Sequence, residues 1–169
     1  TSGSVGVDLA TNGSDWLVTW GYTPYNDHRV LAARLDRNGV LLDQHPLELA
    51  QYAPKSQFLA PAVAWDGTAY VVAWAVPGSG GGSPTNIIAR RITPAAGLAP
   101  MDGTGFTLAT VRSTSRRVSL TSTPGGVLAA YDRGLRLGQG IRRAFLRPIV
   151  HCAAPETPCP PELMLPAEG

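Results

Sequence analysis

The sequence predicts an all-β protein made of three copies of one structural unit. Each copy contains a polar, glycine-containing turn followed by an apolar strand. This strand ends at Trp20 in the first copy and at Trp74 in the second, and in a looser third copy it ends at Tyr131. The steps between these positions are 54 and 57 residues. Hydrophobic residues make up 44% of the chain and charged residues only 15%, so Gly, Pro, Ser, Thr and backbone must complete the surface, as is typical of all-β proteins. A chain of 169 residues is long enough to bury the core of one domain.

Each copy begins with a short strand that runs into a turn. The segments 7–10 and 61–65 precede an Asn-Gly and an Asp-Gly pair, at Gly13 and Gly67 respectively. These pairs predict tight hairpins, because their central residues tolerate a positive φ. In the third copy the strand 118–120 precedes a Pro-Gly-Gly turn.

An aromatic strand follows each turn, over residues 16–20, 70–74 and 127–131. The segment 70–74 is apolar at every position, whereas a half-exposed strand would alternate, so we expect it to be covered on both faces. The aromatic residues are predicted to anchor the packing between copies. They are Trp16, Trp20, Tyr70, Trp74 and Tyr131.

Two further strands complete each copy. The third strands, 30–35, 87–92 and 141–146, align without gaps at steps of 57 and 54 residues, and the fourth are expected near 47–50, 106–109 and 162–165. A Gly, Ser and Pro segment at 77–84 is predicted to be a surface loop within the second copy. The chain is therefore expected to form one repeat domain over residues 1–169. Its repeats span about 5–56, about 57–113 and about 114–169, the last with a cysteine-containing insertion.

This order of turn, aromatic strand, arginine-containing strand and short apolar strand resembles repeats of secreted and surface proteins of Gram-negative bacteria, notably myxobacteria. The resemblance implies that each copy is a four-stranded antiparallel blade and that the chain is a three-blade segment of a β-propeller. Because propellers usually carry four to eight blades, further blades, a second copy or another chain would complete the ring. The alternative fold is a β-trefoil, which also has three four-stranded repeats, although its QxW-type sugar-binding signature is absent.

The insertion in the third copy contains both cysteines, Cys152 and Cys159, separated by six residues. A disulfide across this short, proline-containing loop is predicted, which fits an oxidising compartment, so we expect a secreted, periplasmic or cell-surface protein. Half of a metal site, together with His151, or unpaired thiols are the alternatives. The chain begins at Thr1 and not at Met, as expected of a mature product or part of a longer chain. No apolar run approaches the roughly 20 residues of a transmembrane segment.

The formal net charge is +2, but basic residues concentrate in the third copy. Residues 111–150 hold eight arginines and one acid, Asp132; the arginines are Arg112, Arg116, Arg117, Arg133, Arg136, Arg142, Arg143 and Arg147. They form a candidate patch for an anionic glycan or for an acidic face of a neighbouring subunit. The alternative is that the arginine stems cover apolar strands while their heads remain in water. Nucleic acid is not expected as a partner, because neighbouring strand arginines point to opposite faces and no aromatic residues are interleaved with them.

Residues in catalytic or metal-binding spacing are not evident. The histidines, His28, His45 and His151, fall in three separate connecting segments, and neither a G-x-S-x-G turn nor a calcium loop is present. We therefore expect no metal, cofactor or catalytic residue, and the sequence favours a binding scaffold for protein or glycan within a larger assembly. The alternative is part of a propeller hydrolase or lyase with its catalytic residues outside this segment. Its only internal candidates would be Asp27, Asp102 and Asp132.

Overall fold

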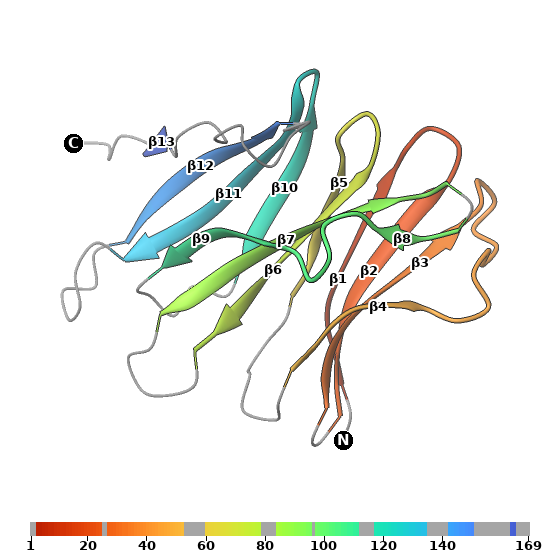
Figure 1. Cartoon of the computed structure of the whole chain (residues 1–169), viewed down its shortest axis with the longest axis horizontal. Coiled ribbons are helices and arrows are strands. Elements are labelled where there is room, and N and C mark those ends of the chain that lie inside the picture. The colour runs from red at the N-terminus through yellow and green to blue at the C-terminus, as the bar shows by residue number, and fades with distance from the viewer. Residues whose placement is uncertain are drawn as a thin grey trace.

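The structure is all-β. The computed structural model describes residues 3–24, 27–52, 60–78, 84–95, 97–111, 117–134, 142–150 and 163–164. These residues form strands and no helix, which confirms the predicted fold class. The strands form three antiparallel sheets, which we call the first, second and third sheet in chain order. Figure 1 shows the three sheets side by side, with the second sheet in the middle.

Consecutive strands are neighbours throughout the first and third sheets and from β5 to β8 in the second. The first sheet contains β1 (Gly3–Thr11), β2 (Trp16–Thr23), β3 (His28–Leu35) and β4 (Leu47–Tyr52). The second contains β5 (Ala62–Trp65), β6 (Tyr70–Pro77), β7 (Thr85–Thr93), β8 (Ala99–Pro100) and β9 (Phe106–Val111), with β8 and β9 both paired to β7. The third contains β10 (Val118–Thr123), β11 (Gly126–Gly134), β12 (Arg142–Val150) and β13 (Leu163–Met164). The four predicted strands of each copy are present, and the short β8 is the one that sequence reasoning missed.

The two predicted glycine turns share one local chemistry. The Asn12 Oδ1 accepts hydrogen bonds from the main-chain N–H groups of Ser14 and Asp15, each at 2.8 Å. The Asp66 Oδ1 makes the equivalent bonds one copy later. The next residue is a glycine in both turns, with a φ of 93° at position 13 and 101° at position 67, where a side chain would be strained. Each loop has four residues between its strands, so these hairpins are wider than the predicted two-residue turns.

The strand register corrects one alignment. Trp20 lies opposite Leu31, Trp74 opposite Ile88, and Tyr131 opposite Phe145. The third strands of the second and third sheets are thus related by 57 residues, and the predicted step of 54 was wrong by three. The sequence match misled because alanine and arginine recur at several positions in these strands. A β-bulge also recurs, at Val30 in the first sheet and at Ile87 in the second.

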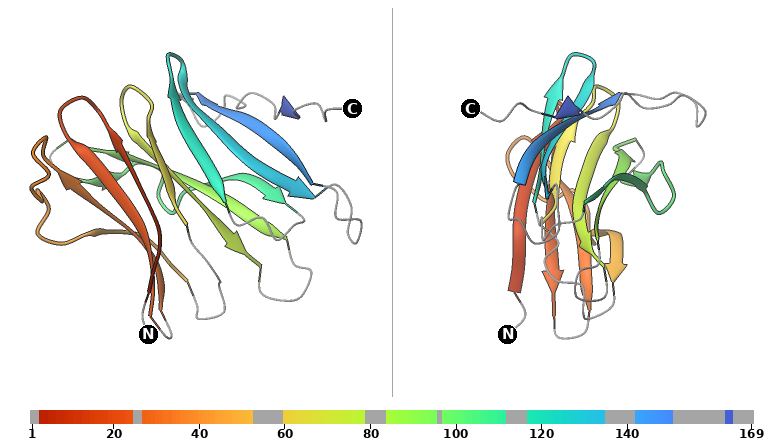
Figure 2. Two further views of the ribbon diagram at one scale, coloured as in Figure 1. Left: turned by 180° about the vertical axis from the view of Figure 1, so that it is seen from behind. Right: turned by 90° about the vertical axis from the view of Figure 1, so that its left-hand side faces the viewer.

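The sheets stack through apolar faces, and their first strands lie next to one another. β1 contacts β5, and β5 contacts β10, so these three first strands lie side by side, as Figure 2 also shows. We call β1, β5 and β10 the inner strands. Among the described residues the sheets do not close into a ring or barrel.

The second sheet is covered on both faces, as its apolar strand predicts. Tyr70, Val72 and Trp74 belong to the core cluster shared with the first sheet. Val71 and Ala73 belong to the cluster shared with the third sheet, and none of the five residues is exposed to solvent. Every position of this strand is apolar because successive side chains enter two different cores.

Candidate functional site

A cleft of about 630 Å³ opens where the inner strands of the three sheets meet. Its walls come from the middle of β1 and from the beginnings of β5 and β10 with the residues just before them. The lining residues are Gly6, Val7, Asp8, Ala60, Pro61, Ala62, Arg117, Val118, Ser119 and Leu120. Clefts formed between packed units, with few polar groups in a mainly apolar wall, are common ligand sites.

A bulge in β1 shapes one side of this cleft. The pairing of β1 with β2 shifts register between Val5 and Val7, and Gly6 between them has a φ of 69°. A Cβ on Gly6 would lie 2.8 Å from the Cβ of Ala60, so only glycine lets β1 approach the segment before β5 this closely. The glycine therefore sets the width of the cleft between the first and second sheets.

The polar groups of the cleft are Asp8, Arg117 and Ser119. The Asp8 carboxylate joins two sheets, because its Oδ2 accepts a 2.9 Å hydrogen bond from the main-chain N–H of Val63 in β5. Its Oδ1 accepts a second bond, also of 2.9 Å, from the N–H of Leu9. Arg117 and Ser119 are exposed at the start of β10. The cleft thus offers a guanidinium and a hydroxyl to a ligand, while its carboxylate is engaged in sheet contacts.

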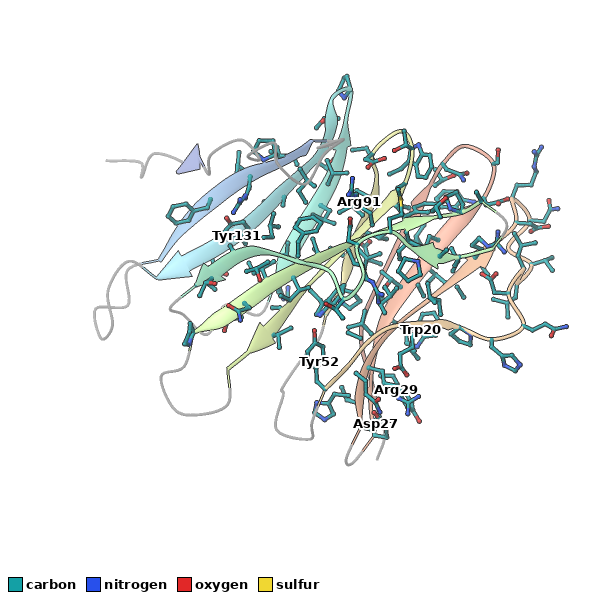
Figure 3. All side chains as sticks on the ribbon, viewed as in Figure 1. Trp20, Asp27, Arg29, Tyr52, Arg91 and Tyr131 are labelled. Atoms are coloured by element: carbon teal, nitrogen blue, oxygen red, sulfur yellow. The ribbon has the colours of Figure 1, made fainter. Side chains whose placement is uncertain are left out.

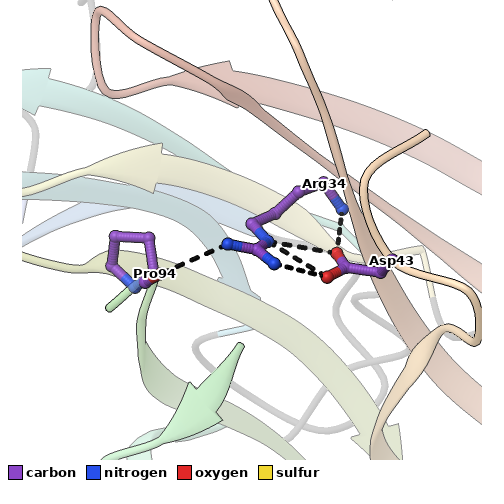
Figure 4. Close-up of polar contacts among 3 residues, drawn as sticks. All are labelled: Arg34, Asp43 and Pro94. Carbon is purple, nitrogen blue, oxygen red and sulfur yellow. Dashed lines mark hydrogen bonds and ion pairs between the residues drawn. The ribbon is translucent and has the colours of Figure 1, made fainter. Parts of the chain in front are cut away.

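Two arginine–aspartate pairs recur in the first and second sheets, and sequence reasoning did not identify them as pairs. The Arg34 Nη2 lies 2.7 Å from the Asp43 Oδ1, and the Arg91 Nη2 lies 2.6 Å from the Asp102 Oδ1. In both pairs the arginine's own main-chain N–H also donates to the carboxylate. Arg34 donates in addition to the Pro94 carbonyl at 3.3 Å and so links the first sheet to the second (Figure 4).

These pairs favour the ionised carboxylates. Burial opposes ionisation of Asp43, but hydrogen bonds from Arg34 lower its pKa below the ordinary value. The pKa of Asp102 is lowered in the same way, because the hydrogen bonds from Arg91 outweigh the effect of burial. Both carboxylates therefore hold the segment before the fourth strand against the third strand, and neither is available as a general acid near neutral pH.

A second arginine position recurs, and its side chain forms a hydrogen bond with the preceding sheet. The Arg90 Nη1 donates to the Leu49 carbonyl of the first sheet, and the Arg147 Nη1 donates to the Leu108 carbonyl of the second. The two arginines occupy equivalent positions, since Arg90 lies opposite Val72 and Arg147 lies opposite Ala129 in the corresponding strand pairs. Burial lowers the pKa of Arg90.

The structure describes only some of the residues of the predicted arginine patch. Arg147 makes the inter-sheet contact just described, and Arg117 is exposed beside the cleft. Arg133 and Arg143 lie opposite each other across β11 and β12. Arg142 is the first residue of β12. Outside the described residues lie Arg112, Arg116, Arg136, Cys152 and Cys159. The anion-binding patch and the disulfide remain predictions.

The aromatic residues fall into two groups. Trp74 and Tyr70 are fully buried between the first and second sheets, and the Trp74 Nε1 donates a 2.9 Å hydrogen bond to the Tyr52 hydroxyl. Burial raises the pKa of Tyr70 to about 12. Tyr131 is 4% exposed and stacks on Phe145, with ring centroids 6.3 Å apart.

Trp16 and Trp20 differ, because they remain half-buried on the first sheet. Figure 3 shows Trp20 and Tyr131 on different sheets. The recurring aromatic position is therefore buried in two sheets and partly open in one.

The described acids and histidines do not assemble a reactive centre. No group of three or more His, Cys, Asp or Glu side chains that could hold a metal ion occurs within the described ranges. Asp27 lies beside Arg29 in the first sheet (Figure 3), and hydrogen bonds from Arg29 and Gln51 lower its pKa. Asp102 is paired within the second sheet, and Asp132 lies in β11 of the third. The structure does not bring these three candidate acids together.

Helices capable of crossing a membrane are not found in the part of the chain that the structure describes. A scan against protein-family models gave no match, and neither the curated proteins nor the solved structures contained a significantly similar chain.

Proposed function

We propose that the chain is a three-blade portion of a β-propeller and acts as a non-catalytic scaffold that binds protein or glycan outside the cytoplasm. One observation carries this proposal: three antiparallel sheets, of four, five and four strands, stack through corresponding apolar faces, with their first strands side by side. Propeller blades pack in this manner around a central axis. A trefoil would instead close its hairpins into one barrel, and the separate stacked sheets favour blades.

The cleft between the inner strands is the site at which the scaffold would bind its ligand. In a propeller the inner strands border the central axis, so a ligand there would contact several blades at once. Arg117 and Ser119 supply donors for an anionic or hydroxyl-rich group, and the wall as a whole is about equally polar and apolar. These groups suit a carboxylated or sulfated glycan, or an acidic loop of a partner protein.

The contacts of the acidic side chains favour binding over catalysis. The alternative role in a hydrolase or lyase needs carboxylates that are free to exchange protons with a substrate. Asp27 and Asp102 are held by arginines, and Asp8 accepts main-chain hydrogen bonds. The extracytoplasmic location rests on the predicted disulfide between Cys152 and Cys159.

A glycan-binding experiment tests the scaffold function. The purified chain is titrated calorimetrically with a sulfated glycosaminoglycan, a polyuronate and a neutral glucan, in parallel with the variant Arg117→Glu. The matched control is Arg37→Glu, which makes the same charge change at an exposed arginine in the turn between β3 and β4. We expect an anionic glycan to bind, with affinity reduced at least tenfold by Arg117→Glu and by 0.5 M salt, but little changed by the control.

Degradation of any of these glycans by the purified chain would contradict the non-catalytic assignment. Equal losses in the two variants would show that binding follows net charge and not the cleft.

A further inference from the structure

The first sheet has an apolar face against which no other described sheet packs. On the side away from the second sheet, β1 carries Val7 and Leu9, which are 68% and 55% exposed. Trp16 and Trp20 of β2 and Leu31 of β3 lie on the same side and are half-buried. We call these five residues the aromatic face. An exposed apolar group of this kind, with two tryptophans, is typical of an interaction surface.

The repeat shows what covers such a face. Trp20 is equivalent by register to Trp74, which is fully buried against the first sheet, and to Tyr131, which is buried against the second. Leu31 is likewise equivalent to Ile88. In both internal seams this face packs on the preceding sheet. The natural occupant of the aromatic face is therefore another four-stranded sheet of the same kind.

The third sheet carries a matching face at the other end of the stack. The residues of the first sheet that pack against Trp74 include Leu17, Val30 and Ala32. Their equivalents in the third sheet, which we call the aliphatic face, are Leu128, Ala144 and Leu146. Ala144 is exposed, and both leucines are half-buried. The chain thus carries a bulky aromatic face on its first sheet and a small aliphatic face on its third sheet, of the two kinds that meet in its internal seams.

We propose that two copies of the chain associate head to tail, with the aromatic face of each copy packed on the aliphatic face of the other. This inference rests on the proposed propeller architecture. Two copies supply six blades, which lies within the range of known rings, and a two-fold axis along the ring centre produces two identical seams. The association closes, so no apolar face remains to continue a filament.

The seam between copies lacks one polar contact that both internal seams have. Ala33 lies opposite Val18, at the position held by Arg90 and Arg147 in the other two sheets. Those arginines donate to a main-chain carbonyl of the preceding sheet, and an alanine cannot. The seam between copies therefore lacks this hydrogen bond. Asp132 lies opposite Ala144, on the same side of the third sheet as the aliphatic face, so the seam also contains an acidic residue.

Sedimentation equilibrium tests this association with matched variants. The aromatic face is disrupted by Leu9→Asp and the aliphatic face by Ala144→Asp, and both positions are exposed in the single chain. The control Val40→Asp places the same charge at an apolar residue, 60% exposed, outside both faces. Far-UV circular dichroism verifies that each variant is folded.

We expect the unmodified chain and the Val40→Asp control to sediment at twice the 17.7 kDa chain mass. Leu9→Asp and Ala144→Asp should each raise the dissociation constant at least tenfold. Mixing these two variants should restore part of the dimer, because the mixed pair retains one intact seam.

Two results would overturn the inference. A folded unmodified chain that stays monomeric at 100 µM would exclude the second copy as the occupant. A dimer lost in Leu9→Asp but retained in Ala144→Asp would mean that two aromatic faces pack on each other. Both results concern the association only, because glycan binding by the cleft is measured separately, by calorimetry.

Discussion

Replacing the recurring tryptophan by alanine should have unequal effects in the first and second sheets. Trp20 and Trp74 occupy the same repeat position, but Trp74 is fully buried, whereas Trp20 is half-buried. The pair therefore separates the effect of burial from the effect of residue type.

The magnitude follows from the buried area. A fully buried tryptophan removes about 250 Å² from water, which at about 25 cal/mol per Å² corresponds to an upper limit of about 6 kcal/mol. Measured tryptophan-to-alanine changes in protein cores cost about 3–5 kcal/mol. Trp74→Ala also leaves the Tyr52 hydroxyl without its donor, which adds about 1 kcal/mol. We expect a loss of about 4–5 kcal/mol for Trp74→Ala and about 2 kcal/mol for Trp20→Ala.

Urea unfolding followed by far-UV circular dichroism measures both losses, because this signal does not depend on tryptophan fluorescence. The chain is kept at low micromolar concentration so that any dimer contributes little to its stability. If Trp74→Ala does not fold, Trp74→Phe keeps most of the ring and should still cost about 1–2 kcal/mol. Equal losses at the two positions, or no loss at Trp74, would refute the assignment of the aromatic position to packing between sheets.

Three further substitutions test individual contacts. Asp102→Asn should cost about 1–3 kcal/mol at pH 7 by removing the ion pair with Arg91. The pKa of Asp102 is lowered on folding, so its contribution to the free energy of unfolding is present above pH 4 and is lost as the pH falls further. Urea unfolding should therefore show a smaller difference in the free energy of unfolding between variant and parent at pH 3 than at pH 7. Arg90→Met removes the hydrogen bond to the Leu49 carbonyl and should lower the thermal midpoint by a few degrees, whereas an unchanged midpoint would show that this contact adds no net stability. Gly105→Ala should cost about 2 kcal/mol in urea unfolding, because its φ is 99° and the new Cβ would lie 2.8 Å from a carbonyl oxygen; a stabilised variant would disprove the strain.

The sequence predicted every described strand except β8, because three independent signals agreed. The turn at Gly13 and Gly67, the doubly apolar strand of 70–74 and the period of the repeat all indicated the same stacked meanders. The alignment of the third strand failed where these signals were absent. Residues 141–146 match the earlier strands in composition, but only the pairing of Tyr131 with Phe145 reveals the true register.

The polar contacts could not be predicted from the sequence because they depend on long-range geometry. Arg34 and Arg91 stand at equivalent positions of the aligned third strands. Their carboxylate partners, Asp43 and Asp102, follow them after connections of different length, so the pairs do not align in the sequence. Likewise, the position of Arg147 in a basic stretch suggested a surface role, whereas the fold places its guanidinium against a carbonyl of the preceding sheet. The cleft beside Arg117 has no local sequence signature, since its walls come from three separate strands.

The meander topology has a consequence for the order in which the chain folds. Because every strand of the first sheet pairs with a neighbour in sequence, that sheet can form before the second has been synthesised. Each later sheet then adds to a surface that already exists, and its own other face becomes the surface for the next. Growth of this kind is vectorial, because each finished sheet presents the apolar surface on which the sheet that follows it in the chain can assemble.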